Sequence, residues 1–185
     1  MRERRARRLL IQVSCGLLLL LGPAARVRVA AQDAMKIVPL RSGTKVRLIY
    51  KKRSVVVNME EEVRDTLPGN EPHRYKTLLT ATKDKNLYML VRVCSGSPVS
   101  SPTAPCGGDQ PCALLWIKTD ERLANREIRS EIYASCSYNY YPVGAPRIAR
   151  GKLSVVYRMG ADDGKKTELT YDNRHPERGI VVKEL

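Results

Sequence analysis

The sequence predicts an all-β fold: a single antiparallel β-sandwich or partly open barrel of about nine short strands, held together by disulfides. Three observations lead to this fold class. Apolar and polar residues alternate over several runs, as a half-buried strand requires, because successive side chains point to opposite faces of a sheet. Turn-forming residues separate these runs, and helical periodicity is confined to two short segments.

The alternation is clearest in three runs. In residues 87–93 every second side chain, from Leu87 to Val93, is apolar, and residues 128–138 and 152–159 alternate in the same way. The remaining predicted strands are residues 45–51, 54–58, 75–83, 114–119, 167–171 and 180–183. Together these runs give the nine expected strands.

Turn chemistry joins the runs into hairpins. Residues 83–86 (KDKN) and 160–164 (GADDG) each connect two strand-like runs. Helical pattern occurs only in residues 59–66 and 121–126, and neither segment is long enough to bury an amphipathic face by itself. We therefore expect antiparallel neighbours with short connections.

The N-terminal segment has the three parts of a secretory signal. Residues 1–8 carry five arginines, residues 9–21 are mostly apolar, and Val29-Ala30-Ala31 places small residues before Gln32. The apolar run is shorter than the ~20 residues of a membrane-spanning helix. We expect export and cleavage after residue 31, with an uncleaved anchor as the alternative, and a single domain over residues 32–185.

The chain is basic, with 33 Lys and Arg against 19 Asp and Glu and a formal charge of +14. Residues 1–31 carry seven of the basic residues and one of the acidic ones, so the rest of the chain has a net charge of +8. This charge favours acidic partners, although it also keeps a small exported domain soluble. The basic residues are dispersed, with no block of five or six that would mark an interaction tail.

Four cysteines follow the signal. They are Cys94, Cys106, Cys112 and Cys136. An even number in an exported protein predicts two disulfides, and the three possible pairings stay open. Their spacing lacks the C-x-x-C pairs of a structural zinc site, so no metal is expected. If the strands beside them form a meander, the cysteines lie at one end of a sheet and hold the flexible Ser/Pro-rich loop predicted at residues 95–111.

The sequence has no recognisable catalytic set. His73 and His175 lie beside prolines in polar surroundings and are expected to be exposed loop residues. The nucleophile elbow, the zinc-protease helix and the phosphate-binding loop are all missing from the sequence. We expect no catalytic residue and no cofactor.

The candidate binding surface follows the last cysteine. Tyr138, Asn139, Tyr140 and Tyr141 provide rings and an amide that can stack on and hydrogen-bond a partner, unless the tyrosines close the end of the core. Arg147 and Arg150 follow closely in the sequence and would supply charge for an acidic ligand. Trp116, in the most apolar run, is expected in the core.

We therefore expect a secreted or periplasmic, non-catalytic binding or interaction module. Its partner would be an acidic envelope polymer or another exported protein. The sequence has no nucleic-acid-binding motif, and membrane association is expected only through an uncleaved signal. Two alternatives remain: an extracytoplasmic hydrolase whose Glu and His residues meet in space, and a small disulfide-bonded hydrolase inhibitor.

Overall fold

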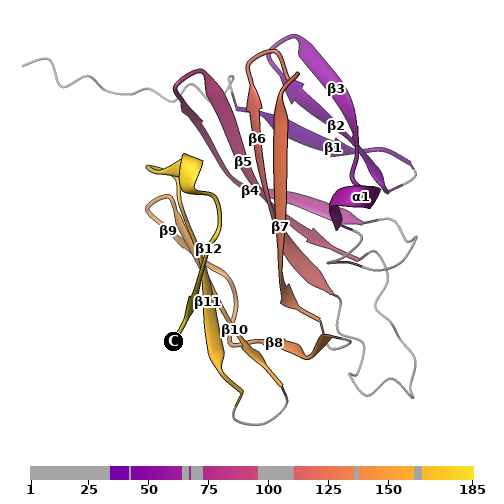
Figure 1. The fold of residues 1–185 in the computed structure, drawn as a ribbon. Helices are drawn as coiled ribbons and strands as arrows, with labels where there is room; N and C mark the ends of the chain where they lie inside the picture. Colours follow the sequence, from indigo (N-terminus) through magenta and orange to yellow (C-terminus); the bar gives the residue numbers. More distant parts are fainter. Residues whose placement is uncertain are drawn as a thin grey trace, which may run out of the picture.

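The computed structural model describes residues 34–41, 43–63, 67, 73–95, 111–135, 138–160 and 164–185. The predicted signal, residues 1–31, lies outside the described residues, as do most of the predicted loop at 95–111 and two of the cysteines, Cys106 and Cys136. The described chain is all-β and forms three antiparallel sheets (Figure 1).

The three sheets follow one another along the chain. The first sheet has the order β1-β2-β3, with β1 (Lys36–Pro39), β2 (Lys45–Tyr50) and β3 (Arg53–Asn58). The second is a meander of β4 (Arg74–Lys83), β5 (Asn86–Cys94), β6 (Cys112–Asp120) and β7 (Arg126–Ala134). The third has the order β12-β11-β10-β8, and β9 also pairs with β10; its strands are β8 (Tyr140–Pro142), β9 (Arg147–Ala149), β10 (Lys152–Met159), β11 (Lys166–Asp172) and β12 (Val181–Glu184).

The β4–β7 sheet lies between the other two sheets and is covered on both faces (Figure 1). In β5, Met89 and Val91 pack with the β1–β3 sheet, whereas Leu90 packs with the third sheet. In β6, Leu115 packs on the first side and Trp116 on the second. The fold is therefore three-layered, because alternate residues of the two central strands enter two separate cores. The first core lies between the β1–β3 sheet and the β4–β7 sheet, and the second core lies between the β4–β7 sheet and the third sheet.

A bulge lets β4 contribute to both cores. The pairing of β4 with β5 shifts between Thr77 and Leu79, so one extra residue changes which side chains face each way. Before the bulge Tyr75 packs into the first core, and after it Leu79 packs into the second.

One disulfide links the two central strands. Cys94 and Cys112 are directly opposite each other in the β5–β6 ladder, with Cα atoms 4.1 Å apart. The Ser95 N–H donates to the Pro111 carbonyl at 3.0 Å, just beyond the bridge. The bond closes the base of the segment between β5 and β6, at the end of the sheet where the sequence predicted the cysteines. The sequence predicted a second disulfide without choosing its partners, and the two remaining cysteines, Cys106 and Cys136, lie outside the described residues.

The strand count and the number of sheets differ from the expectation. All nine predicted strands are present, but the described residues form twelve strands in three sheets, where a single sandwich or barrel of about nine was expected. The three additional strands, β1, β8 and β9, have four residues or fewer, too few to show alternation. Of the two helical segments, only α1 (Glu60–Val63) forms. In the part of the chain that the structure describes, no helix has the length and apolarity of a membrane span.

Candidate binding sites

The predicted tyrosine surface lies at the disulfide end of the molecule. After β7 the chain reverses, and Ser135 and Tyr140 exchange two backbone hydrogen bonds of 2.9 and 2.8 Å. Asn139 adopts a left-handed conformation, with φ of 59°, that an asparagine tolerates better than most residues. The reversal starts β8, whose Tyr141 lies opposite Arg158 of β10.

The tyrosines of this surface do not share one environment. The half-buried Tyr140 ring packs 5.3 Å from the Tyr157 ring and joins the second core. The Tyr141 ring lies under the Arg158 guanidinium at 5.9 Å, and Tyr138 is 43% exposed. Tyr138 is therefore exposed, Tyr141 is half-buried against Arg158, and Tyr140 belongs largely to the core.

The structure does not bring Arg147 and Arg150 to these tyrosines. Arg147 lies opposite Ser154 near the start of β10, whereas Tyr141 lies opposite Arg158 near its end. The two positions are four residues apart along the strand, or ~13 Å. Arg150 lies in the turn beyond β9, farther still from the tyrosines.

The histidines are far apart, and one of them is not where the sequence suggested. His73 was expected to be exposed, but it is 5% exposed and its ring contacts the Tyr75 ring edge-on at 6.4 Å. His73 directly precedes the first residue of β4. His175 lies at the other end of this strand: it is close to Glu177, and Glu177 accepts a 2.7 Å hydrogen bond from Lys83, the last residue of β4. A ten-residue strand of ~33 Å separates the two imidazoles, so they cannot act in one site.

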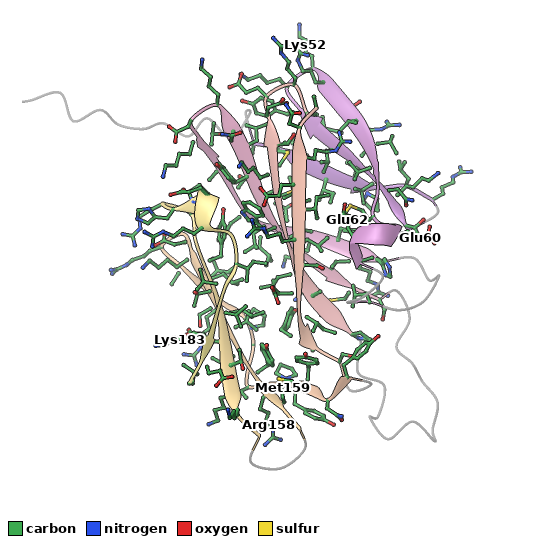
Figure 2. All side chains as sticks on the ribbon, in the orientation of Figure 1. Lys52, Glu60, Glu62, Arg158, Met159 and Lys183 are labelled. Atoms are coloured by element: carbon green, nitrogen blue, oxygen red, sulfur yellow. A yellow bond between two sulfur atoms is a disulfide. The ribbon has the colours of Figure 1, made fainter. Side chains whose placement is uncertain are left out.

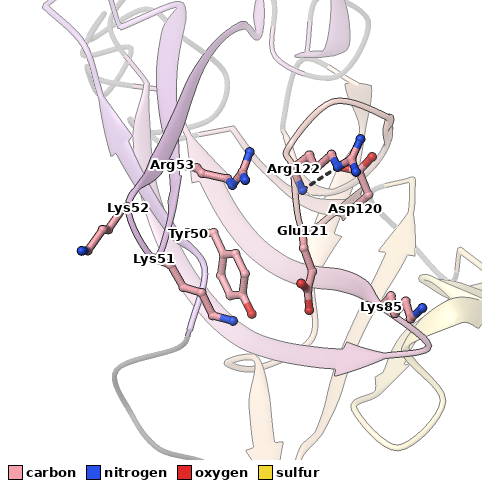
Figure 3. A pocket seen from close by; sticks show the side chains of 8 residues that line it. All are labelled: Tyr50, Lys51, Lys52, Arg53, Lys85, Asp120, Glu121 and Arg122. Atoms are coloured by element: carbon pink, nitrogen blue, oxygen red, sulfur yellow. Dashed lines mark hydrogen bonds between the residues drawn. The ribbon is translucent and has the colours of Figure 1, made fainter.

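A basic cavity lies at the end of the central sheet away from the disulfide. It has a volume of about 690 Å³ and is formed by three hairpin turns (Figure 3). Its lining residues are Tyr50, Lys51, Lys52, Arg53, Lys85, Asp120, Glu121 and Arg122. Tyr50 is buried, and the Lys51 ammonium lies 5.0 Å from the centre of its ring. Five cations and two carboxylates therefore surround a space bounded on one side by a tyrosine ring.

Local backbone geometry places these side chains. Tyr50 and Arg53 pair at the ends of β2 and β3, leaving Lys51 and Lys52 as a two-residue turn in which Lys51 has a φ of 52°. The β4–β5 turn is equally tight, with positive φ angles at both Asp84 and Lys85. Two positive φ angles are typical of a type I′ hairpin, which matches the twist of the strands.

One of the two carboxylates already serves the fold. Asp120 Oδ1 accepts hydrogen bonds from the backbone N–H groups of Arg122 and Ala124, at 2.9 and 3.0 Å, and Oδ2 accepts one from the Asn125 side chain at 3.0 Å. These bonds, that of Ala124 first, hold the pKa of Asp120 below its ordinary value. The carboxylate fixes the β6–β7 loop and so positions Arg122 beside the cavity.

Four of the five cations of the cavity are unpaired among the described residues. Lys52, Arg53, Lys85 and the Arg122 guanidinium form no ion pair among the described residues. On the third sheet, by contrast, Asp172 is paired with both Lys152 and Arg174. The unpaired cations give the cavity an excess of positive charge, and a positively lined depression concentrates anions.

Sequence reasoning did not find this cavity. Its cations come from three turns far apart in the chain, so no run of like charges shows in the sequence. One signal was present: residues 34–59 contain seven basic residues and no acidic one.

No metal-binding group of three or more His, Cys, Asp or Glu side chains occurs among the described residues. The chain matches no protein-family model, and neither curated proteins nor solved structures give a significant match.

Proposed function

We propose that this protein is an exported, non-catalytic binding module and that its ligand is negatively charged and occupies the basic cavity. The observation that carries the proposal is the convergence of five cations from three turns on one cavity, where one of the two carboxylates is engaged by its own loop. Figure 3 shows Arg53, Arg122 and Lys85, from three different turns, placed around Tyr50 and Glu121. Such a ligand would supply counter-charges to Lys52, Arg53, Lys85 and Arg122, which form no ion pair among the described residues.

The strength of binding would come from several contacts acting together. A single exposed ion pair contributes only ~0–1 kcal/mol and is weakened by salt. The cavity presents cations from three turns, so a ligand with more than one negative group can form several such pairs at once. We therefore expect moderate, salt-sensitive affinity for a ligand with several negative groups.

Two features support binding over acid–base catalysis. The ~33 Å between the ends of β4 keeps the histidines from cooperating, and each faces a different environment: His73 is buried beside Tyr75, and His175 is exposed beside Glu177. The three-part N-terminal segment and the Cys94–Cys112 disulfide support the proposed export, since disulfides persist in oxidising compartments.

The experiment compares two variants of equal net charge. Lys85→Glu with Arg122→Glu changes the cavity, and Arg147→Glu with Arg150→Glu changes two exposed arginines on and after β9. Each protein is applied to an immobilised sulfated polysaccharide and eluted with a salt gradient. We expect the cavity variant to elute at markedly lower salt than the control variant. If both variants elute at equally reduced salt, binding depends only on net charge and the proposal fails. If the control variant elutes at the lower salt, the ligand binds at Arg147 and Arg150 instead.

A second candidate function is supported by the tyrosine end. Tyr138, Val143 and Met159 are all exposed there, and Figure 2 shows Met159 beside Arg158 at the end of the molecule opposite Lys52. Exposed aromatic and apolar groups next to an arginine are common in protein-binding surfaces. This surface would bind an exported protein while the cavity binds the anionic ligand.

A further inference from the structure

The β1–β3 sheet carries positive charge that its own residues do not balance. Its seven basic residues are Lys36, Arg41, Lys45, Arg47, Lys51, Lys52 and Arg53, and residues 34–59 contain no acid. Apart from Lys51, none of the seven forms an ion pair within the described ranges. The ion pairs formed by Lys83, Lys118, Arg129, Lys152, Lys165, Arg174 and His175 lie on the other two sheets or the segments that follow them.

The cations form a row on the outer face of this sheet. Along β2, Val46, Leu48 and Tyr50 are buried against the core, so the alternate residues face outward. Lys45 and Arg47 are exposed on that face at a spacing of two residues, or ~7 Å. Lys36 of β1 lies opposite Ile49 and so continues the row by one more step.

The row leads into the cavity. β2 ends at Tyr50, and the next residues, Lys51 and Lys52, line the cavity together with Arg53. From Lys45 to Lys51 the strand covers six residues, or ~20 Å. Positive groups therefore follow one another at short intervals from the outer face of the sheet to the three turns.

Apolar groups flank the row. Val38 of β1 and Val56 of β3 lie opposite Arg47 on either side, and they are 42% and 49% exposed. The guanidinium thus stands between two half-exposed aliphatic side chains, and β1, β2 and β3 contribute no carboxylate to this face.

We propose that the outer face of the β1–β3 sheet is a track for a linear acidic polysaccharide, one end of which occupies the basic cavity. The inference rests on the proposed function, because the cavity is the anchoring end of the track. A linear chain with repeated acidic groups can pair with several cations of the row at once, whereas a small anion would use only one of them. Val38 and Val56 offer contact to the aliphatic faces of the sugar rings.

Single-stranded nucleic acid fits this face less well. Proteins that bind it without sequence preference stack bases on aromatic side chains. The outward residues of the sheet are Lys36, Val38, Lys45, Arg47, Ile49, Ser54, Val56 and Asn58, none of which is aromatic. The acidic polysaccharide is therefore the occupant that the chemistry of the face favours.

The test measures how affinity depends on ligand length. Fluorescently labelled acidic oligosaccharides, from disaccharides to chains longer than the ~20 Å track, are titrated with the full protein. The variants are Lys45→Gln with Arg47→Gln on the track, Lys85→Gln with Arg122→Gln in the cavity, and Arg147→Gln with Arg150→Gln as the control. Circular dichroism verifies that each variant is folded.

We expect affinity to rise with length until the chain spans the track. The affinity of the track variant for long chains should fall about tenfold, because two exposed contacts worth about threefold each are removed. Its affinity for disaccharides should be unchanged. The cavity variant should weaken binding at every length, and the control should bind like the parent protein.

The possible failures are distinguishable. Affinity independent of length, or an unaffected track variant, would overturn the track while the cavity variant still upholds the proposed function. If the cavity variant binds like the control, the proposed function fails as well. A single-stranded oligonucleotide of equal charge that binds as tightly as the long oligosaccharide would overturn the assignment of the track to a polysaccharide.

Discussion

The indole Nε1 of Trp116 donates a 2.9 Å hydrogen bond to the carbonyl oxygen of Pro176, which lies 60 residues later in the chain. Trp116 is a buried residue of β6, and Pro176 begins η3 (Pro176–Arg178), the short turn that follows β11. This one bond joins the central sheet to the third sheet at a point where both partners are buried. The same carbonyl accepts a 3.2 Å bond from the Gly179 N–H, so the turn is held from both sides.

Replacing Trp116→Phe should destabilise the protein by about 1–3 kcal/mol, because a buried carbonyl loses a hydrogen-bond partner and the core loses apolar volume. Urea unfolding followed by circular dichroism measures this difference. Gly179→Ala should also destabilise the turn, because Gly179 has a φ of 70° that alanine rarely adopts. If both variants unfold at the parental urea concentration, the Trp116–Pro176 contact does not secure the two sheets.

Removing the disulfide by Cys94→Ala with Cys112→Ala should lower the free energy of unfolding by about 3 kcal/mol. The bridge spans a sequence separation of 18 residues, and closing a loop of that size restricts the unfolded chain by about this amount. Urea unfolding with and without reductant measures it. Peptide mapping of the unreduced parent protein should find these two cysteines joined and leave Cys106 and Cys136 to pair with each other. A free thiol at either of those two positions would contradict the second pairing.

Tyr140 and Tyr141 should respond differently to alanine. Tyr140→Ala removes a half-buried ring from the second core and should destabilise by about 2 kcal/mol, roughly half the loss of a fully buried aromatic residue. Tyr141→Ala removes a ring that rests against Arg158 and should change stability by less than about 1 kcal/mol. Thermal unfolding of the two single variants separates these effects. A larger loss for Tyr141 would reverse the assignment of core and surface.

Alkaline pH should destabilise the protein through Tyr75. Burial raises the pKa of Tyr75 to about 12, and its hydroxyl donates to the Gly43 carbonyl at 3.2 Å. The unfolded state ionises near a pKa of about 10 while the native state keeps its proton, so stability is retained below pH ~10 and lost as the pH rises from ~10 to ~12.

Tyr75→Phe tests this pH dependence. At pH ~8 the variant should be less stable by about 1 kcal/mol, because one hydrogen bond is lost. Its stability should fall less steeply than that of the parent between pH ~10 and ~12, because phenylalanine does not ionise. Denaturant melts at several pH values measure both slopes. Parallel curves would show that Tyr75 does not contribute to the alkaline loss.

The sequence predicted the strands well because their patterns are local. Leu87, Met89, Val91 and Val93 alternate as one face of β5, and the structure places all four in the first core. The other face, with Tyr88 and Leu90, is also apolar, which is typical of a strand covered on both sides. The prediction assumed that only one face of this strand is buried, so it gave a two-layered sandwich, whereas the molecule has three layers.

The cavity and the position of His73 could not be predicted because both depend on contacts between distant segments. Lys85 and Arg122 come from different hairpins, and each by itself is an ordinary turn residue. His73 is preceded by polar residues and a proline, but packing against Tyr75 buries it. The tyrosine surface and the two arginines were predicted together because they are close in the sequence. In the structure they lie at opposite ends of β10, because β8 pairs with its end and β9 with its start.

The double burial of β5 has a consequence for how the gene tolerates variation. On β10, Leu153, Val155 and Tyr157 are buried while Lys152 and Arg158 are exposed, so substitutions there should be tolerated at every second codon. On β5 the five consecutive residues from Leu87 to Val91 are all buried, each in one core or the other. Polar replacements should therefore be rejected at every one of these codons, and a saturation scan should show tolerance with a two-residue rhythm on β10 and none on β5.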